Sequence, residues 1–168
     1  VDRVLGEDMQ SLSSHLSTAY SEVELSLNTP PTKEELLKEA QEGADYQKRW
    51  ANNLIQKIDD VESLRTSYPY PVEVWKIGEQ PIVILGGEDV IDYSISLKRI
   101  FGQNLFVLGY SNDVMSYIPS ARIVQEGGYE GASSQMVYGL PATWKPNIET
   151  KIIEEVLQLA NQMGVPMA

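Results

Sequence analysis

The sequence predicts an α/β domain with a mixed sheet, and two observations favour this class. An apolar run at 81–85, a helical pattern at 89–101 and another apolar run at 105–108 follow one another. This strand–helix–strand order is typical of two parallel strands joined by a right-handed crossover. The strand-like segment 72–77 comes just before them, separated by a Gly-Glu pair that suits a hairpin. Parallel and antiparallel pairing together predict a mixed sheet with flanking helices and a long functional loop.

The N-terminal part of the chain is predicted to be mostly helical. Apolar residues at helical spacing predict an amphipathic helix over 1–19, whereas 20–27 alternates between apolar and polar residues as a half-buried strand does. Thr32 and Glu35 form a capping box, so a helix should begin there. A stripe at i, i+4 spacing predicts another helix over 44–63. We interpret the last two helices as a peripheral cover on the core.

The second half of the chain contains a long irregular stretch. Residues 109–146 have little periodicity, and only a short helix is expected there, over 120–126. They hold five of the twelve glycines and four of the nine tyrosines, which is too aromatic for a disordered segment. Loops of this length in compact domains are usually functional. We therefore predict a site here, followed by an amphipathic helix over 148–163.

The composition limits the classes of partner. The 168 residues, 42% of them hydrophobic, suffice for one compact domain, predicted to comprise a mostly helical cover at 1–66 and an α/β segment at 67–168. The net charge of −11 argues against nucleic acid, because phosphate binding is driven by Lys and Arg. No apolar run reaches the ~18 residues of a transmembrane segment. The absence of cysteine excludes thiolate metal sites.

The order of the strands brings two loops together. Ligands of open α/β sheets bind beyond the C-terminal ends of the strands. The loops that follow the two crossover strands should therefore place Glu88 near Asn112, Asp113 and Tyr117.

Each of these residues also has a structural interpretation. Glu88 opens a helix, where the helix dipole favours a carboxylate. Asn112 and Asp113 suit an Asx turn or an N-cap, and Tyr117 would pack in the loop. His15, the sole histidine, is interpreted as structural or exposed beside the first predicted helix. The residue pattern alone supports a loop-borne site and no named reaction.

Two segments of the irregular stretch contain a distinctive motif. The first, 109–119, contains an Asn-Asp pair and a Tyr four residues after the Asp; the second is Tyr-Glu-Gly-Ala-Ser at 129–133. Together they resemble the neutral/alkaline non-lysosomal ceramidases. Gly86-Gly87-Glu88 is similar to the Gly-Glu segment of that family. The amino-acid sequence of the whole chain is more similar to a bacterial branch of ceramidase-like proteins than to the characterised enzymes. The resemblance covers most of this chain and only the C-terminal part of the family's catalytic domain.

The resemblance implies a zinc-dependent amide hydrolase that converts N-acylsphingosine to sphingosine and a fatty acid. In the family, two histidines, a glutamate and a tyrosine bind the zinc. Glu88 matches the zinc-binding glutamate, Tyr117 the zinc-binding tyrosine, and Tyr129 a catalytic tyrosine that donates to the developing oxyanion. The residues expected to support the loop are Asn112, Asp113, Gly128, Glu130 and Gly131.

The resemblance also implies what a complete enzyme would need besides this chain. The family's zinc-binding histidines and its Gly-Asp-x-Ser segment lie further toward the N-terminus and have no match here. We interpret the chain as part of a longer parent protein whose N-terminal remainder completes the zinc site. We expect the chain alone to bind zinc weakly and to be inactive. The expected substrate is an N-acyl lipid or another small molecule, and the expected location is secreted or periplasmic.

Two other functions remain open. One is a non-catalytic module that uses the tyrosine-rich loop to hold a lipid or glycan; the other is a hydrolase of a different N-acyl or ester substrate. For Met136 and Trp144, two interpretations are likewise open. They line an apolar groove for the substrate, or they pack the loop.

Overall fold

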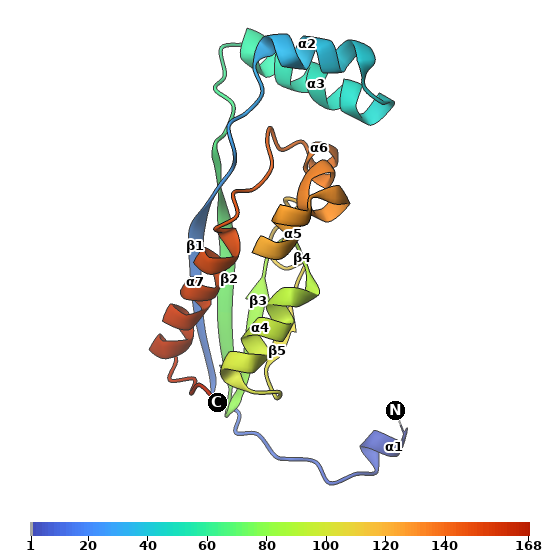
Figure 1. Cartoon of the computed structure of the whole chain (residues 1–168). Helices are drawn as coiled ribbons and strands as arrows, with labels where there is room; N and C mark the ends of the chain where they lie inside the picture. The colour runs from blue at the N-terminus through green and yellow to red at the C-terminus, as the bar shows by residue number, and fades with distance from the viewer. Residues whose placement is uncertain (1) are drawn as a thin grey trace.

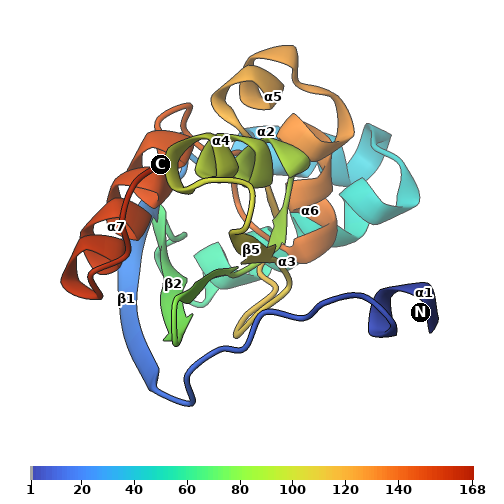
Figure 2. The same ribbon diagram turned by 90° about the horizontal axis from the view of Figure 1, so that it is seen from below.

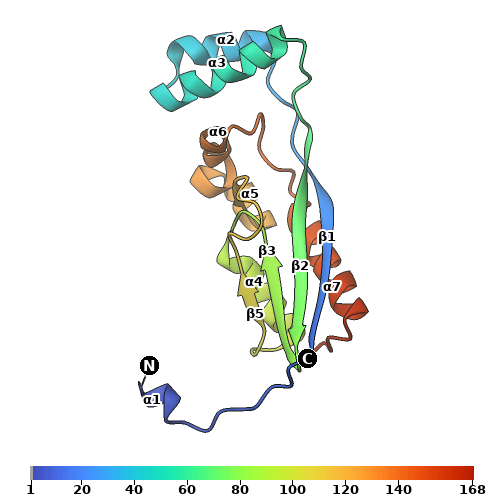
Figure 3. The ribbon, with the colours of Figure 1, turned by 180° about the vertical axis from the view of Figure 1, so that it is seen from behind.

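The computed structural model describes residues 2–168 and is built on a four-stranded mixed sheet of order β1-β2-β3-β5 (Figures 1 and 3). β1 (Leu16–Ser26), β2 (Ser67–Ile77) and β3 (Gln80–Leu85) are antiparallel neighbours. β5 (Phe106–Leu108) joins β3 in parallel. The predicted α/β class with a mixed sheet is therefore confirmed.

The strand–helix–strand crossover is the unit that positions the site. α4 (Ile91–Phe101) connects β3 to β5 and buries Tyr93, Leu97 and Phe101, which follow one another at four-residue spacing. This spacing places all three side chains on one face of the helix. The hairpin between β2 and β3 turns at Gly78, whose φ of 59° suits a residue without a Cβ.

Two helices cover one face of the sheet. α7 (Ile148–Gln162) packs on β1 and β2, and α4 lies next to it on the same face (Figure 2). The apolar stripe of α7 is fully buried at Ile148, Ile152 and Val156, as its periodicity predicted. On the opposite face of the sheet, large apolar side chains are exposed, among them Phe106 and Leu108.

The predicted helix over 1–19 is wrong. Only α1 (Asp2–Leu5) is helical, and it buries no residue. β1 begins at Leu16 and pairs with β2 over eleven consecutive residues. An apolar stripe with no surface to pack against does not stabilise a helix in water. The C-terminal part of the predicted helix, from Leu16 onward, pairs with β2 as a strand instead. His15 consequently lies just before β1, where its carbonyl accepts a hydrogen bond from the Gly78 amide.

A pair of helices lies beyond one end of the sheet (Figure 1). α2 (Lys33–Glu42) begins at the predicted capping box: Thr32 Oγ1 accepts from the Glu35 amide at 3.2 Å, and Glu35 Oε2 accepts from the Thr32 amide at 2.7 Å. α3 (Asp45–Asp59) ends earlier than predicted. The two helices share a small apolar cluster of their own, formed by Leu36, Trp50, Ala51 and Leu54.

Residues 109–146 are more regular than predicted. They form β6 (Tyr117–Ile118), α5 (Ala121–Glu126), the π-helical turn η1 (Tyr129–Ser133) and α6 (Ser134–Tyr138). The short helix expected over 120–126 is confirmed as α5, whereas the other elements, of two to five residues, are too short to show a period in the sequence. Gly139, in the left-handed region, ends α6. None of the helices in the described part of the chain has the length and hydropathy to span a membrane.

Candidate active site

The site is formed where the loop after β3 meets the loop after β5. β4 (Glu88–Asp89) pairs in parallel with β6, so that Glu88 lies opposite Tyr117. The Glu88 amide donates to the Ser116 carbonyl at 2.8 Å, and the Gly87 amide donates to the Asp113 carbonyl at 2.7 Å. Glu88 and Tyr117, which are distant in sequence, are therefore brought together as expected.

Gly87 makes this close approach possible. Its φ is 69°, and a Cβ at this position would lie 2.6 Å from Ile118 Cγ1 and 2.8 Å from the Ser116 carbonyl. A side chain would therefore force the two loops apart. The Gly-Gly dipeptide before Glu88 has a steric role in holding the loops together.

Tyrosine side chains surround the Glu88 carboxylate. Tyr138 donates its hydroxyl to Oε1, and Tyr110 donates its hydroxyl to Oε2 at 2.8 Å. The Tyr117 ring packs edge to face against both Tyr138 and Tyr129, with ring centroids 6.5 and 5.6 Å apart. We call this set of residues the Glu88 cluster: Glu88, Tyr110, Tyr117, Tyr129 and Tyr138.

The hydrogen bonds to Glu88 favour its ionised form and the neutral forms of Tyr110, Tyr117 and Tyr138. The hydrogen bond from Tyr138, followed by those from Tyr110 and Tyr117, lowers the pKa of Glu88. The hydrogen bond to Glu88 raises the pKa of Tyr117 to about 12, and it raises the pKa of Tyr138 and Tyr110 as well. Among the ion pairs of residues 2–168, none involves Glu88. Its negative charge is therefore stabilised by phenols without being neutralised.

The predicted supporting residues shape the loops instead of contacting Glu88. Asn112 adopts a left-handed conformation with φ of 65°, and the Asp113 carboxylate accepts a hydrogen bond from the Tyr68 hydroxyl. Gly128 precedes η1, and Gly131 packs so tightly against the Ile123 carbonyl that a Cβ would overlap it. Glu130 is exposed. Asn112 and Asp113 therefore fit the structural interpretation given for them, and Gly128 and Gly131 fit a role in shaping the loop.

The sequence did not single out two members of the cluster. Tyr110 lies within the recognised loop motif, yet no role was assigned to it. Tyr138 lies outside the motif, fifty residues after Glu88, and reaches the carboxylate because η1, which packs on β6, leads directly into α6. The one available signal was the concentration of four tyrosines in residues 109–146.

The cluster fits part of a zinc site. A carboxylate offers about four lone-pair sites, so the phenols that donate to Glu88 leave at least one site for a cation. A carboxylate and a tyrosine are oxygen donors that zinc accepts, although its catalytic sites usually also contain histidine. Within residues 2–168, no group of three or more His, Cys, Asp or Glu side chains is arranged to hold a metal. His15 lies at the hairpin end of the sheet, opposite to the end that carries Glu88.

A cleft between α3 and α6 leads to the cluster. Two adjoining cavities of about 650 and 480 Å³ are both lined by Leu54, Lys57 and Tyr138. Met136 lines the larger cavity and also packs against the apolar cluster of α2 and α3. Trp144 is fully buried and donates its Nε1–H to the Tyr117 carbonyl at 2.9 Å, so it packs the loop.

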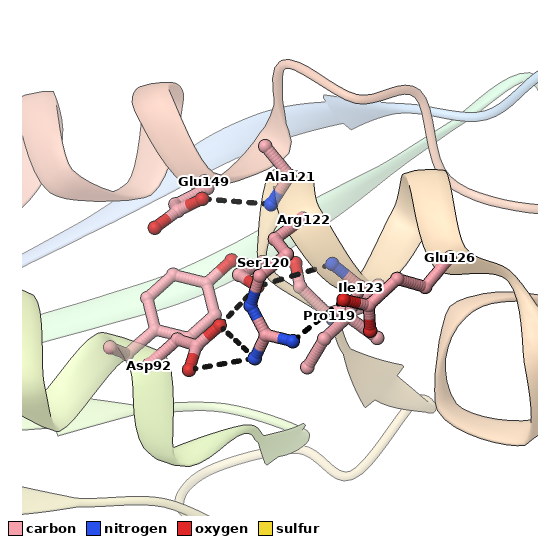
Figure 4. Close-up of polar contacts among 9 residues, drawn as sticks. Asp92, Pro119, Ser120, Ala121, Arg122, Ile123, Glu126 and Glu149 are labelled. Carbon is pink, nitrogen blue, oxygen red and sulfur yellow. Dashed lines mark hydrogen bonds and ion pairs between the residues drawn. The ribbon is translucent and has the colours of Figure 1, made fainter.

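A second polar cluster lies at the N-terminal end of α4, where Asp92 follows Glu88 by four residues in the sequence (Figure 4). Asp92 Oδ2 accepts hydrogen bonds from Ser120 Oγ at 2.5 Å and from Arg122 Nη2 at 3.0 Å. Glu149 Oε2 accepts from the Ala121 amide at 2.8 Å. These contacts join α4, α5 and α7, and we call them the Asp92 bracket.

Comparisons with known proteins give one match. No family model matches the chain, and neither does any curated protein. Among solved structures, the chain is similar to the neutral ceramidase from Pseudomonas aeruginosa, at 13% sequence identity and a TM-score of 0.47. The similarity covers 92% of this chain and 29% of the ceramidase chain. The chain therefore spans less than a third of the length of that protein.

Proposed function

We propose that this chain contributes Glu88, Tyr117 and Tyr129 to the active site of a zinc-dependent amide hydrolase of the ceramidase type. The observation that carries the proposal is the Glu88 cluster, in which an ionised carboxylate without an ion-pair partner is surrounded by phenols. The ceramidase-like motif, which supplies three of its tyrosines, supports the same reading.

Glu88 and Tyr117 would hold the metal from one side. Zinc bound in such a site acidifies a water molecule to a pKa near ~7, which makes a nucleophile available at neutral pH. Glu88 offers an anionic oxygen whose orientation is fixed by hydrogen bonds from two phenols. Histidines from the N-terminal remainder of a longer protein would complete the ligand set.

Tyr129 would stabilise the transition state. The residue is 51% exposed and its ring packs edge to face against Tyr117, so its side chain would be accessible to a substrate bound beside the proposed metal ligands. A phenol that donates to the amide carbonyl oxygen stabilises the negative charge that develops there during attack. Removal of one such donor typically lowers kcat by ~10²–10³.

The substrate that the resemblance implies is N-acylsphingosine, acted on in a secreted or periplasmic setting. The cleft between α3 and α6 is lined by both polar and apolar side chains, and its apolar part, which includes Leu54 and Met136, would contact the acyl part of an N-acyl compound. An ester with the same acyl group would also fit this surface, so the two bond types need to be compared directly.

The test is hydrolysis of a short-chain N-acylsphingosine by the full-length protein that contains this chain. Glu88→Gln is expected to abolish both fatty-acid release and zinc retention. Tyr129→Phe is expected to lower kcat ~10²-fold with zinc retained. Asp92→Asn serves as the matched control, because this carboxylate belongs to the Asp92 bracket, and it should keep zinc and activity.

Two results would count against the proposal. Full activity of Glu88→Gln would separate the cluster from the chemistry, and hydrolysis confined to the matched ester would replace the amide as substrate. The 168-residue chain by itself is expected to be inactive, so robust amidase activity from it would contradict the need for further ligands.

A further inference from the structure

We propose that Tyr138 is a positioning residue for Glu88 and that the α2–α3 pair holds it in place. This inference rests on the proposed zinc site, and it assigns a part in that site to a helix pair that carries no ceramidase-like motif. The observations that support it are the hydrogen bond from Tyr138 to Glu88 Oε1 and the buried contacts that anchor α6 to α3.

Tyr138 and Tyr110 each donate one hydrogen bond to Glu88, and they do so from different environments. Tyr110 is 63% exposed, so its side chain loses conformational freedom when it bonds to the carboxylate. Tyr138 is half-buried, packs against Tyr117, and is the last residue of α6. A donor that is already immobilised by packing fixes the orientation of its acceptor better than a mobile one does.

The position of α6 is set by α3. The indole Nε1–H of Trp50 donates to the Leu140 carbonyl at 2.8 Å in a buried contact, two residues beyond Tyr138. Met136, on α6, packs against the apolar cluster of the helix pair. The Leu140 amide in turn donates to the Gln135 carbonyl at 3.0 Å, which closes the turn that contains Tyr138. A chain of direct contacts therefore runs from α3 to the Glu88 carboxylate.

Tyr138 also forms part of the wall of the cleft. It lines both cavities between α3 and α6 while its hydroxyl bonds to Glu88. Tyr110 lines neither cavity. A ligand in the cleft would thus contact the same side chain that orients the proposed metal ligand.

The test compares Tyr138→Phe with Tyr110→Phe in the full-length protein. Each variant removes one hydroxyl that donates to Glu88 and keeps the ring. Zinc affinity is measured by competition with a chromophoric chelator, well below the melting temperature of each variant. Mutation of a residue that orients a metal ligand typically weakens metal binding by ~10–100-fold. We expect Tyr138→Phe to weaken zinc binding by at least ~10-fold and Tyr110→Phe by no more than ~3-fold.

A remote variant separates positioning from direct contact. Trp50→Phe removes the Nε1–H bond to Leu140 and leaves the Glu88 cluster chemically intact. It should weaken zinc binding in the same direction as Tyr138→Phe and by a smaller factor. Equal zinc affinities for wild type and Tyr138→Phe would overturn the inference.

Crystal structures of the metal-free variants give a readout that does not depend on zinc. Glu88 should leave its wild-type rotamer in Tyr138→Phe and keep it in Tyr110→Phe. An unchanged rotamer in Tyr138→Phe would overturn the inference, whatever the metal content. If wild type takes up no zinc and the rotamer still depends on Tyr138, the proposed function fails and the positioning role stands.

Discussion

Two carboxylates near the start of α4 have opposite surroundings. Asp92 accepts hydrogen bonds from a serine hydroxyl and a guanidinium, so its charge is paired within the fold. Glu88 accepts hydrogen bonds from phenols only, and its charge stays uncompensated. Both have a lowered pKa, yet for different reasons: Ser120 and then Arg122 stabilise the Asp92 carboxylate, whereas Tyr138 and Tyr110 stabilise that of Glu88.

The difference shows how a structural carboxylate is distinguished from one that can bind a cation. A paired carboxylate has little to gain from a metal, because the cation would have to compete with an arginine already in place. A carboxylate held by neutral donors keeps its full negative charge and free lone pairs in a fixed orientation. A lowered pKa alone would not separate the two residues.

The largest expected effect concerns the backbone that brings Glu88 to Tyr117. In Gly87→Ala the new Cβ would meet Ile118 and the Ser116 carbonyl, and we expect the free energy of unfolding to fall by about 3 kcal/mol or more. Gly127→Ala is the matched control, because its φ of 71° is nearly the same and no atom lies within 4 Å of the added Cβ. Gly127→Ala should lower the free energy of unfolding by about 1 kcal/mol. Urea unfolding measures both, and equal losses would show that close approach at Gly87 is unimportant.

Removal of the paired carboxylate is expected to have an intermediate effect. Asp92→Ala deprives Ser120, which is 2% exposed, and Arg122 of their shared acceptor. The free energy of unfolding should fall by about 1–2 kcal/mol, with zinc content unchanged. Glu126→Ala removes the exposed partner of the same arginine and should cost less than about 0.5 kcal/mol. Loss of zinc in Asp92→Ala would erase the distinction between the two carboxylates.

The smallest effect concerns the residue after Glu88. Burial raises the pKa of Asp89 to about 6. Because this exceeds the unfolded value of ~4, the folded state binds the proton more tightly, and stability falls as the pH rises from ~4 through ~6. Asp89→Asn should remove this fall and, since the side chain is only half-buried and partly screened, raise stability at pH 7.5 by about 1 kcal/mol. Denaturant unfolding at pH 4 to 8 tests it; a wild-type stability that rises with pH across this window would contradict the assignment.

The fold was predictable where side chains pack on a large apolar surface. The crossover through α4 and the stripe of α7 were both readable, because their buried residues recur at helical spacing. The same spacing led to the wrong prediction of a helix over residues 1–19, because the local sequence does not show whether a surface is available to bury the apolar stripe. Long-range pairing with β2 decided that segment instead.

The site was predictable in its framework and not in its full membership. Glu88 and Tyr117 followed from strand order and from the loop motif, and the pairing of β4 with β6 brings them together. Tyr138 has no local signature, because its role arises from α6 resting on Trp50. Asn112 and Asp113 illustrate the reverse case: they belong to the motif, yet they shape the loop and do not contact Glu88.

The most direct test of the contrast between the two carboxylates is the zinc content of the full-length protein after metal-replete dialysis. Wild type, Glu88→Gln and Asp92→Asn are compared by elemental analysis. We predict one zinc per chain in wild type and in Asp92→Asn, and its loss or strong weakening in Glu88→Gln. Absence of zinc from wild type, or equal zinc in Glu88→Gln, would contradict the assignment of the Glu88 cluster as a metal-binding site.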